Sequence, residues 1–238
     1  MPVRQLYRQT LVGRGYHSDP AQLRAVHALE RCENEWADYK ARRGNALTKL
    51  IARPPIPRGV YMHGGVGRGK SFLMDCFFQA VPLTRKTRLH FHEFMREVHK
   101  ELADLHGTVN PLQELARRIS LRHRLICFDE FHVADVTDAM ILHRLLEGLF
   151  ENRVSIVTTS NFHPDELYPN GLHRDRILPA IALLKAKLEV INVDNGADYR
   201  QLTLAQLGLY HTPLGLVADT EMMQAFDRLA EARDEDPV

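Results

Sequence analysis

Short apolar runs alternate with longer segments of helical periodicity along most of the chain. Each run before the last is followed by a segment long enough for a helix. Strand and helix alternating in this way predict an α/β fold with a mainly parallel sheet and helices on both faces. The segments LIC and SIVTT are too apolar for a half-solvated sheet and predict central strands. The five runs lie at residues 59–63, 88–94, 124–130, 153–161 and 188–194.

The N-terminal part has a different pattern. Residues 18–43 carry apolar side chains at helical spacing, with Asp19 as a candidate cap and Pro20 suited to the first helical position. Three prolines within residues 53–59 predict a stiff linker after this helix. Beyond Arg200 the alternation fades. We therefore expect an N-terminal helical arm with its linker (1–58), an α/β core (59–199) and a C-terminal tail (200–238).

Composition narrows the class of protein only slightly. Hydrophobic residues at 45% and charged residues at 26% are ordinary for globular proteins, and a formal net charge of +1 gives no support for nucleic acid or anionic lipid as a partner. Cys32, Cys76 and Cys127 show no CxxC spacing, which argues against disulfides and favours a reducing compartment. The first ten residues lack an apolar signal core, and no run reaches the roughly 18 apolar residues of a membrane span. We expect a cytoplasmic protein.

The most specific motif is GGVGRGKS at residues 64–71, which satisfies G-x-x-x-x-G-K-[ST], the P-loop pattern. Glycines let main-chain N–H groups face an anion, and the N-terminus of the following helix adds partial positive charge. A plain glycine-rich turn is the alternative, and the dinucleotide pattern G-x-G-x-x-G does not fit this spacing. We expect Lys70 to reach the β- and γ-phosphates of ATP and Ser71 to bind Mg²⁺. The predicted nucleotide-binding residues are Gly64, Gly65, Val66, Gly67, Arg68, Gly69, Lys70 and Ser71.

Two acidic residues end the apolar run LICFDE. We expect Asp129 to hold the Mg²⁺ shell and Glu130 to polarise the attacking water. A strand that simply ends in acids at the surface is the alternative, but a P-loop about 60 residues upstream favours the catalytic interpretation. A carboxylate that activates water also favours hydrolysis over phosphoryl transfer to a substrate.

Polar residues after the next strand complete the predicted site. Asn161 ends the run 153–161 and fits the position called sensor 1, close to the γ-phosphate; a turn residue before His163 is the alternative. Arg174 and Arg176 are expected at the start of the following helix, where one of them can act as an arginine finger on a neighbour's ATP. Surface solvation is the alternative for both, and the sequence does not separate them.

Three weaker patterns leave more than one interpretation open. His90 and His92 share a face of the predicted strand 88–94, where ordinary polar packing is favoured over a zinc-binding pair or a contact of His92 with Glu130. Gln22 either completes a helix cap or contacts adenine from the N-terminal arm. The basic segment RKTR at 85–88 is interpreted as a solvated turn.

Several segments resemble ZapE-type ATPases, a bacterial cell-division family with mitochondrial relatives in the AAA+ class. The segments DEFHVADVTDAM (129–140) and NGLHRDRILP (170–179) are far more specific than a P-loop alone. The resemblance implies Mg²⁺-dependent ATP hydrolysis, homo-oligomeric assembly and action on protein partners, which for bacterial members include the division-ring tubulin homologue at or near the membrane. The 38 residues after Arg200 are too few for the helical lid of an AAA+ module, so we expect a truncated or absent lid.

The sequence therefore favours an Mg²⁺-dependent ATPase that acts on a protein partner. A module that binds ATP with little turnover and serves only in nucleotide-dependent interaction is the alternative. A GTPase would need the base-reading N/T-K-x-D pattern, which does not follow the fourth strand. A role like that of a helicase loader would rest on fold analogy alone, and the near-neutral charge does not support it. We expect no nucleic-acid partner and at most peripheral membrane association.

Overall fold

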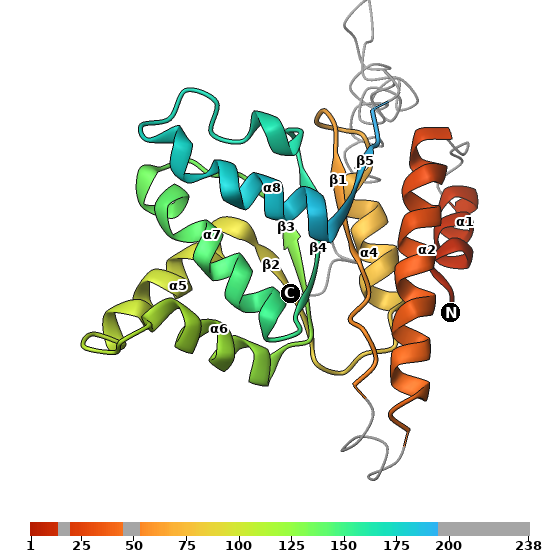
Figure 1. The fold of residues 1–238 in the computed structure, drawn as a ribbon. Coiled ribbons are helices and arrows are strands. Elements are labelled where there is room, and N and C mark those ends of the chain that lie inside the picture. Colours follow the sequence, from red (N-terminus) through yellow and green to blue (C-terminus); the bar gives the residue numbers. More distant parts are fainter. Residues whose placement is uncertain (14–19, 45–52, 195–238) are drawn as a thin grey trace, which may run out of the picture. The chain divides into compact units, whose positions relative to one another are not determined.

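A parallel sheet of five strands lies at the centre of the computed structural model, which describes residues 1–13, 20–44 and 53–194 (Figure 1). The strand order is β2-β3-β4-β1-β5, and every pairing is parallel. The predicted parallel α/β architecture is thus confirmed. The strands are β1 (Gly59–His63), β2 (Lys86–His90), β3 (Leu125–Asp129), β4 (Ser155–Ser160) and β5 (Leu188–Asn192).

Strand order places the chemistry at one edge of the sheet. β4 lies between β1 and β3, with Val157 opposite Val60 on one side and Cys127 on the other. Because all strands run the same way, the segments that follow them emerge at a common edge, where α/β proteins bind ligands. The P-loop follows β1, the acidic pair lies at the end of β3 and Asn161 follows β4. Because these three strands are neighbours, the segments lie side by side.

Helices cover both faces of the sheet (Figure 1). Three of them lie on one side of the sheet, and four others lie on the opposite side. Side chains alternate between the two cores along each strand, so Tyr61 joins one while Val60 and Met62 join the other. The first group is α1 (Val3–Gly13), α2 (Pro20–Ala41) and α4 (Lys70–Ala80); the second is α5 (Phe91–Asp104), α6 (Pro111–Arg122), α7 (Val136–Glu151) and α8 (Leu178–Lys187).

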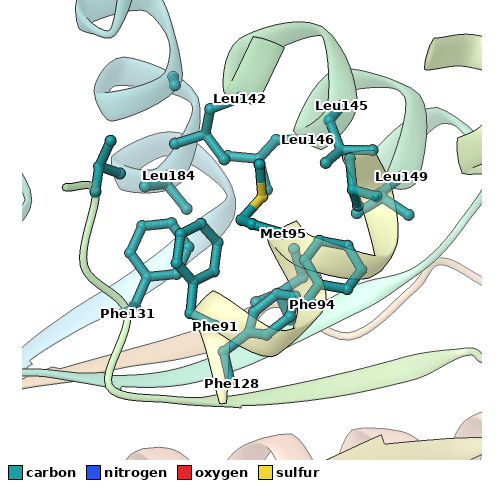
Figure 2. Close-up of a cluster of buried hydrophobic side chains, with 14 of the residues drawn as sticks. Phe91, Phe94, Met95, Phe128, Phe131, Leu142, Leu145, Leu146, Leu149 and Leu184 are labelled. Carbon is teal, nitrogen blue, oxygen red and sulfur yellow. The ribbon is translucent and has the colours of Figure 1, made fainter. Parts of the chain in front are cut away.

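Aromatic side chains fill the core beneath α5 and α7 (Figure 2). The Phe91 ring lies 4.1 Å from that of Phe131 and 5.6 Å from that of Phe128, measured between centroids. Phe128 belongs to β3 and Phe131 follows Glu130, so this cluster packs against the segment that carries the acidic pair. Leucines of α7 and α8 close it from above: Leu142, Leu145, Leu146, Leu149 and Leu184.

Of the N-terminal helices, α2 packs on the sheet, and α1 packs on α2 and α4. The predicted helix is confirmed as α2, whose Leu29 and Trp36 are buried in the same core as β1 and α4. α1 precedes it and was not predicted. All described residues belong to one compact unit, Met1–Asn195, so the expected boundary at residue 58 falls inside it; the tail 200–238 lies outside the described residues. No described helix has the length and apolar character needed to cross a bilayer.

Two local predictions were wrong around β2. The strand expected over 88–94 ends at His90, and α5 begins at Phe91, because Phe91, Phe94, Met95 and Val98 form an apolar helical stripe that the core buries. The basic segment 85–88 is not a solvated turn but part of β2 and its approach. Its charges are used locally: the Lys86 ammonium, for example, donates to the main-chain carbonyls of Phe78 and Val81.

Candidate active site

The P-loop connects β1 to α4 in the way its glycines predict. Gly67 and Gly69 have φ angles of 78° and 79°, in the left-handed region that only glycine adopts at little cost. Gly69 is the residue before α4, and its carbonyl accepts the N–H of Leu73 to open the helix. The loop therefore delivers a helix N-terminus and several main-chain amides to one place, which is an arrangement that attracts anions.

Lys70 joins this loop to the neighbouring strand end. Its ammonium donates to the carbonyl oxygens of Gly64 and Gly65, at 2.7 Å each, and to the side-chain oxygen of Asn161 at 2.9 Å. Asn161 directly follows β4, which pairs with β1. The predicted lysine and the predicted sensor residue are thus brought into direct contact.

Asp129 lies at the end of β3 and is only 8% exposed. Its carboxylate accepts a hydrogen bond of 2.6 Å from Nε of Arg88 on β2, and the same guanidinium also pairs with Asp75 of α4. Burial alone would lower the pKa of Arg88, but the hydrogen bonds to Asp129 and Asp75 raise it, so the guanidinium stays charged. Arg88 was not recognised from the sequence, because the segment 85–88 was interpreted as exposed.

The oxygen atoms predicted for Mg²⁺ fit that ion chemically. Magnesium prefers hard oxygen ligands, which the Asp129 carboxylate and the Ser71 hydroxyl supply. A carboxylate has about four lone-pair positions, so the bonds from Arg88 leave Asp129 able to accept further partners. Ser71 stands in the first turn of α4, immediately after Lys70.

Glu130 adopts a backbone conformation that is uncommon for a side chain of its kind. Its φ of 54° lies in the left-handed region, and its N–H donates to the Thr159 hydroxyl at 3.1 Å. The next residue, Phe131, donates its N–H to the Thr159 carbonyl at 2.7 Å, so β4 holds this strained turn in place. The Glu130 side chain is 72% exposed, which leaves its carboxylate facing solvent beside the buried Asp129.

The histidine beside Glu130 is not the one expected. Nδ1 of His90 lies 3.9 Å from the Glu130 carboxylate, whereas His92 was predicted for this contact. The strand ends at His90, so the alternation used for the prediction does not extend to His92, although the two rings still lie 5.6 Å apart. Among the residues that the structure describes, no group of three or more His, Cys, Asp or Glu could hold a metal ion, so nothing supports a zinc site at this pair.

Glu130 and Asn161 open onto a common cavity of about 590 Å³. Its wall also includes Arg96 of α5, the exposed Phe162 and His132, whose rings lie 5.3 Å apart. The predicted catalytic glutamate and the predicted sensor residue therefore line the same cavity.

Arg174 and Arg176 lie in a short 3₁₀ turn, η2 (Arg174–Arg176), ahead of α8 rather than in its first turn as predicted. The structure distinguishes the two side chains. Arg174 donates to the carbonyl of Asp165, within the other 3₁₀ turn, η1 (Pro164–Glu166), at 2.8 Å. The Arg176 side chain is 66% exposed, with an ion pair of 3.6 Å to the adjacent Asp175.

Two further residues support the P-loop and were not identified as doing so. Asp194, just beyond β5, accepts the N–H of Gly65 at 3.3 Å and lies 3.0 Å from Nε of Arg68. Its position after an apolar strand was a usable signal. Gln22 of α2 donates to the Arg68 carbonyl at 3.1 Å; it is buried against the loop instead of being available to adenine, and its expected capping partner Asp19 lies outside the described residues.

His63 ends β1 immediately before the P-loop. Burial lowers its pKa from the ordinary value of 6.5, and the nearby His163 acts in the same direction, with ring centroids 5.0 Å apart. His63 is therefore a neutral group at neutral pH, beside a loop that carries the Lys70 charge.

Curated proteins from bacteria and a vertebrate are similar to this chain in sequence. Cell division protein ZapE of Escherichia coli (strain K12) is 54% identical over 157 residues, which cover 66% of this chain and 42% of that protein. Lactation elevated protein 1 homolog B of Danio rerio is 39% identical over 191 residues, covering 75% of this chain and 38% of that protein. The chain spans less than half the length of these curated relatives.

Solved structures match at the level of the fold. A replication initiator DnaA bound to AMPPCP and single-stranded DNA gives a TM-score of 0.53 at 13% identity, covering 93% of this chain and 64% of that one. Domain III of the Thermotoga maritima replication initiation protein DnaA gives 0.50 at 13% identity, covering 94% and 90%. The predicted P-loop NTPase fold is confirmed. The profile of AFG1-like ATPases matches residues 1–238, and the chain therefore belongs to this family, as its resemblance to ZapE-type ATPases predicted.

Proposed function

We propose that this chain binds Mg²⁺-ATP in the loop 64–71 and hydrolyses it to act on a protein partner. The contact between Lys70 and Asn161 carries the proposal, because it joins the phosphate-binding loop to a polar group at the end of β4, between the P-loop and the acidic pair. Membership of the AFG1-like ATPases supports the same activity.

Each residue has a defined task in this reaction. Main-chain amides of the loop and the Lys70 ammonium neutralise the β- and γ-phosphates. Ser71 and Asp129 would hold Mg²⁺, which would supply further neutralisation of the phosphate oxygens. Glu130 accepts the proton of a water that attacks the γ-phosphorus, while the bond to the leaving ADP oxygen breaks. Asn161 orients that water, and Arg88 holds the Asp129 carboxylate in place.

Phosphate release by wild type and Glu130→Gln tests hydrolysis. Loss of the general base is expected to lower turnover about a hundredfold while ATP binding persists. Glu151→Gln, at an exposed carboxylate of α7, is the matched control and should behave as wild type. If wild type is no faster than Glu130→Gln although both bind ATP, the chain is an interaction module that binds nucleotide with little turnover.

We propose that the chain assembles with itself and that Arg176 acts as the arginine finger across the subunit boundary. Its exposed guanidinium can reach a neighbour, whereas Arg174 is tied to the Asp165 carbonyl. Mixing Arg176→Ala with Glu130→Gln creates sites that combine an intact Glu130 with a neighbour's intact Arg176. Activity of the mixture above that of either variant supports the assignment, and no gain, or a gain with Arg174→Ala instead, contradicts it.

For the partner, we propose a protein of the division apparatus, as the name of the relative ZapE and the resemblance to its family suggest. The division-ring tubulin homologue is the first candidate, with the chain in the cytoplasm and at most peripherally at the membrane. Co-sedimentation of purified chain with polymers of that homologue, with and without ATP, tests this. The expected ATP-dependent fraction in the pellet should be missing for Lys70→Ala, and equal pelleting of the two proteins contradicts nucleotide control.

A further inference from the structure

A buried hydrogen-bonded chain connects the first helix to the P-loop. The Tyr7 hydroxyl of α1 donates to Oε1 of Gln22 at 3.0 Å, and Nε2 of Gln22 donates to the main-chain carbonyl of Arg68 at 3.1 Å. Tyr7 is fully buried and Gln22 is 2% exposed. Burying an amide costs free energy unless its polar atoms form hydrogen bonds. The buried Gln22 side chain therefore favours the loop conformation that presents the Arg68 carbonyl to it.

The Gln22 amide also fits the glycine that follows. A Cβ atom built on Gly69 would lie 2.6 Å from Nε2 of Gln22, so the amide fills the space that glycine leaves open. Gly69 has the left-handed φ of 79° and immediately precedes Lys70, the first residue of α4. The Gln22 side chain therefore contacts the loop at the point where it turns into the helix.

The hydrogen bond from Gln22 to the Arg68 carbonyl also fixes the direction of the Gly69 N–H, because the two groups belong to one peptide. The peptide between Arg68 and Gly69 is planar, and in the trans form its C=O and N–H point in opposite directions. With the carbonyl bonded to Gln22 of α2, the N–H of Gly69 is turned away from that helix. In a P-loop this N–H is one of the groups that faces the phosphates.

Tyr7, at the other end of this series of hydrogen bonds, is also held in place. The Tyr7 ring stacks on Phe72 of α4 with centroids 5.8 Å apart and planes at 26°. α1 therefore contacts both the glutamine that binds the loop and the helix that the loop begins.

We propose that Gln22 is a positioning residue for nucleotide binding, and that the N-terminal helices set the conformation in which the P-loop accepts a triphosphate. The inference rests on the proposed binding of ATP by this loop. Gln22 acts through the main chain and not on the base, because its amide is buried between Tyr7 and the loop.

Titration calorimetry of the full chain with Mg²⁺-ATP and with inorganic triphosphate separates these roles, since triphosphate has no base. Gln22→Met keeps the side-chain length and removes both hydrogen bonds, and we expect it to weaken both ligands by the same factor, about tenfold. Tyr7→Phe keeps the ring on Phe72 and should weaken both about two- to threefold. Leu29→Ala, in the same core on α2 but away from the loop, is the matched control: it lowers the melting temperature and leaves both dissociation constants unchanged.

The outcomes distinguish the inference from the proposed function. Wild-type constants for folded Gln22→Met, whatever its melting temperature, overturn the positioning role. Weaker ATP binding with unchanged triphosphate binding assigns Gln22 to the base and also overturns it. If wild type and Lys70→Ala bind ATP equally poorly, the proposed function fails and the inference fails with it. Should Gln22→Met not fold, Gln22→Glu keeps the shape and the acceptor for Tyr7 while losing the donor to Arg68, and the same equal loss is expected.

Discussion

The ammonium of Lys70 lies 2.9 Å from the side-chain oxygen of Asn161, and 2.7 Å from each of two P-loop carbonyls. All three of these contacts join the Lys70 ammonium to uncharged oxygen atoms, and an incoming phosphate can replace each of them. A phosphate oxygen carries negative charge, so the exchange of partners favours the nucleotide. The contact thus links loading of the P-loop to the position of Asn161.

Lys70→Ala is expected to weaken ATP binding by about tenfold to a hundredfold, because a charge-assisted hydrogen bond to phosphate is lost. Fluorescence titration with a labelled ATP analogue measures the effect. Lys100→Ala removes an equal charge from the exposed side of α5 and should bind as wild type does. Unchanged affinity in folded Lys70→Ala would place the triphosphate elsewhere.

Substitutions of Asn161 should separate binding from turnover. Asn161→Ala removes the group that orients the water and is expected to lower turnover about a hundredfold with nearly unchanged ATP affinity. Asn161→Asp has the same shape but places a carboxylate against the Lys70 ammonium, where it competes with phosphate and should weaken ATP binding as well. Steady-state phosphate release and equilibrium binding on both variants provide the comparison. Equal ATP affinity for the two would show that Lys70 leaves Asn161 before the nucleotide arrives.

The parts of the site that follow apolar strands could be predicted from sequence. The P-loop, Asp129, Glu130 and Asn161 each come directly after a buried strand, and parallel strands bring such positions to one edge. The local motifs and the parallel direction of the strands therefore sufficed to place these residues at one edge, whereas their adjacency follows from the strand order β3-β4-β1.

The supporting contacts could not be predicted, because they depend on how distant elements pack. Arg88 meets Asp129 only because β2 pairs with β3 in register, and Gln22 meets the loop only because α2 packs against α4. For α1 a signal was present: Val3, Tyr7 and Leu11 are spaced four residues apart and are all buried.

Stability should fall in mild acid, in part because of His63. Burial and then the His163 ring lower the pKa of His63 in the folded chain, whereas the unfolded chain takes up a proton near 6.5. The folded state therefore binds fewer protons in this range, and its free energy of unfolding decreases as the pH drops below about 6.5 towards the lowered pKa. Burial lowers the pKa of His123 with the same sign. Urea unfolding at pH 7.5 and 5.5 measures the loss, which His63→Gln should reduce; an identical pH dependence in that variant would contradict the assignment.

The three cysteine thiols should be unreactive until the protein opens. All three are buried and none forms a disulfide, and burial raises the pKa of Cys32 to about 12 and that of Cys127 further still. Since the thiolate is the reactive form, a disulfide reagent such as DTNB is expected to modify none of them rapidly in native protein and all three in denaturant. Cys76 lies in α4, the helix that follows the P-loop, so Mg²⁺-ATP should slow its modification further by stabilising the folded conformation of this helix. Rapid reaction of one thiol in the native protein would contradict the packing around the cysteines. A rate of Cys76 modification that does not change with nucleotide would contradict the coupling of α4 to the bound ligand.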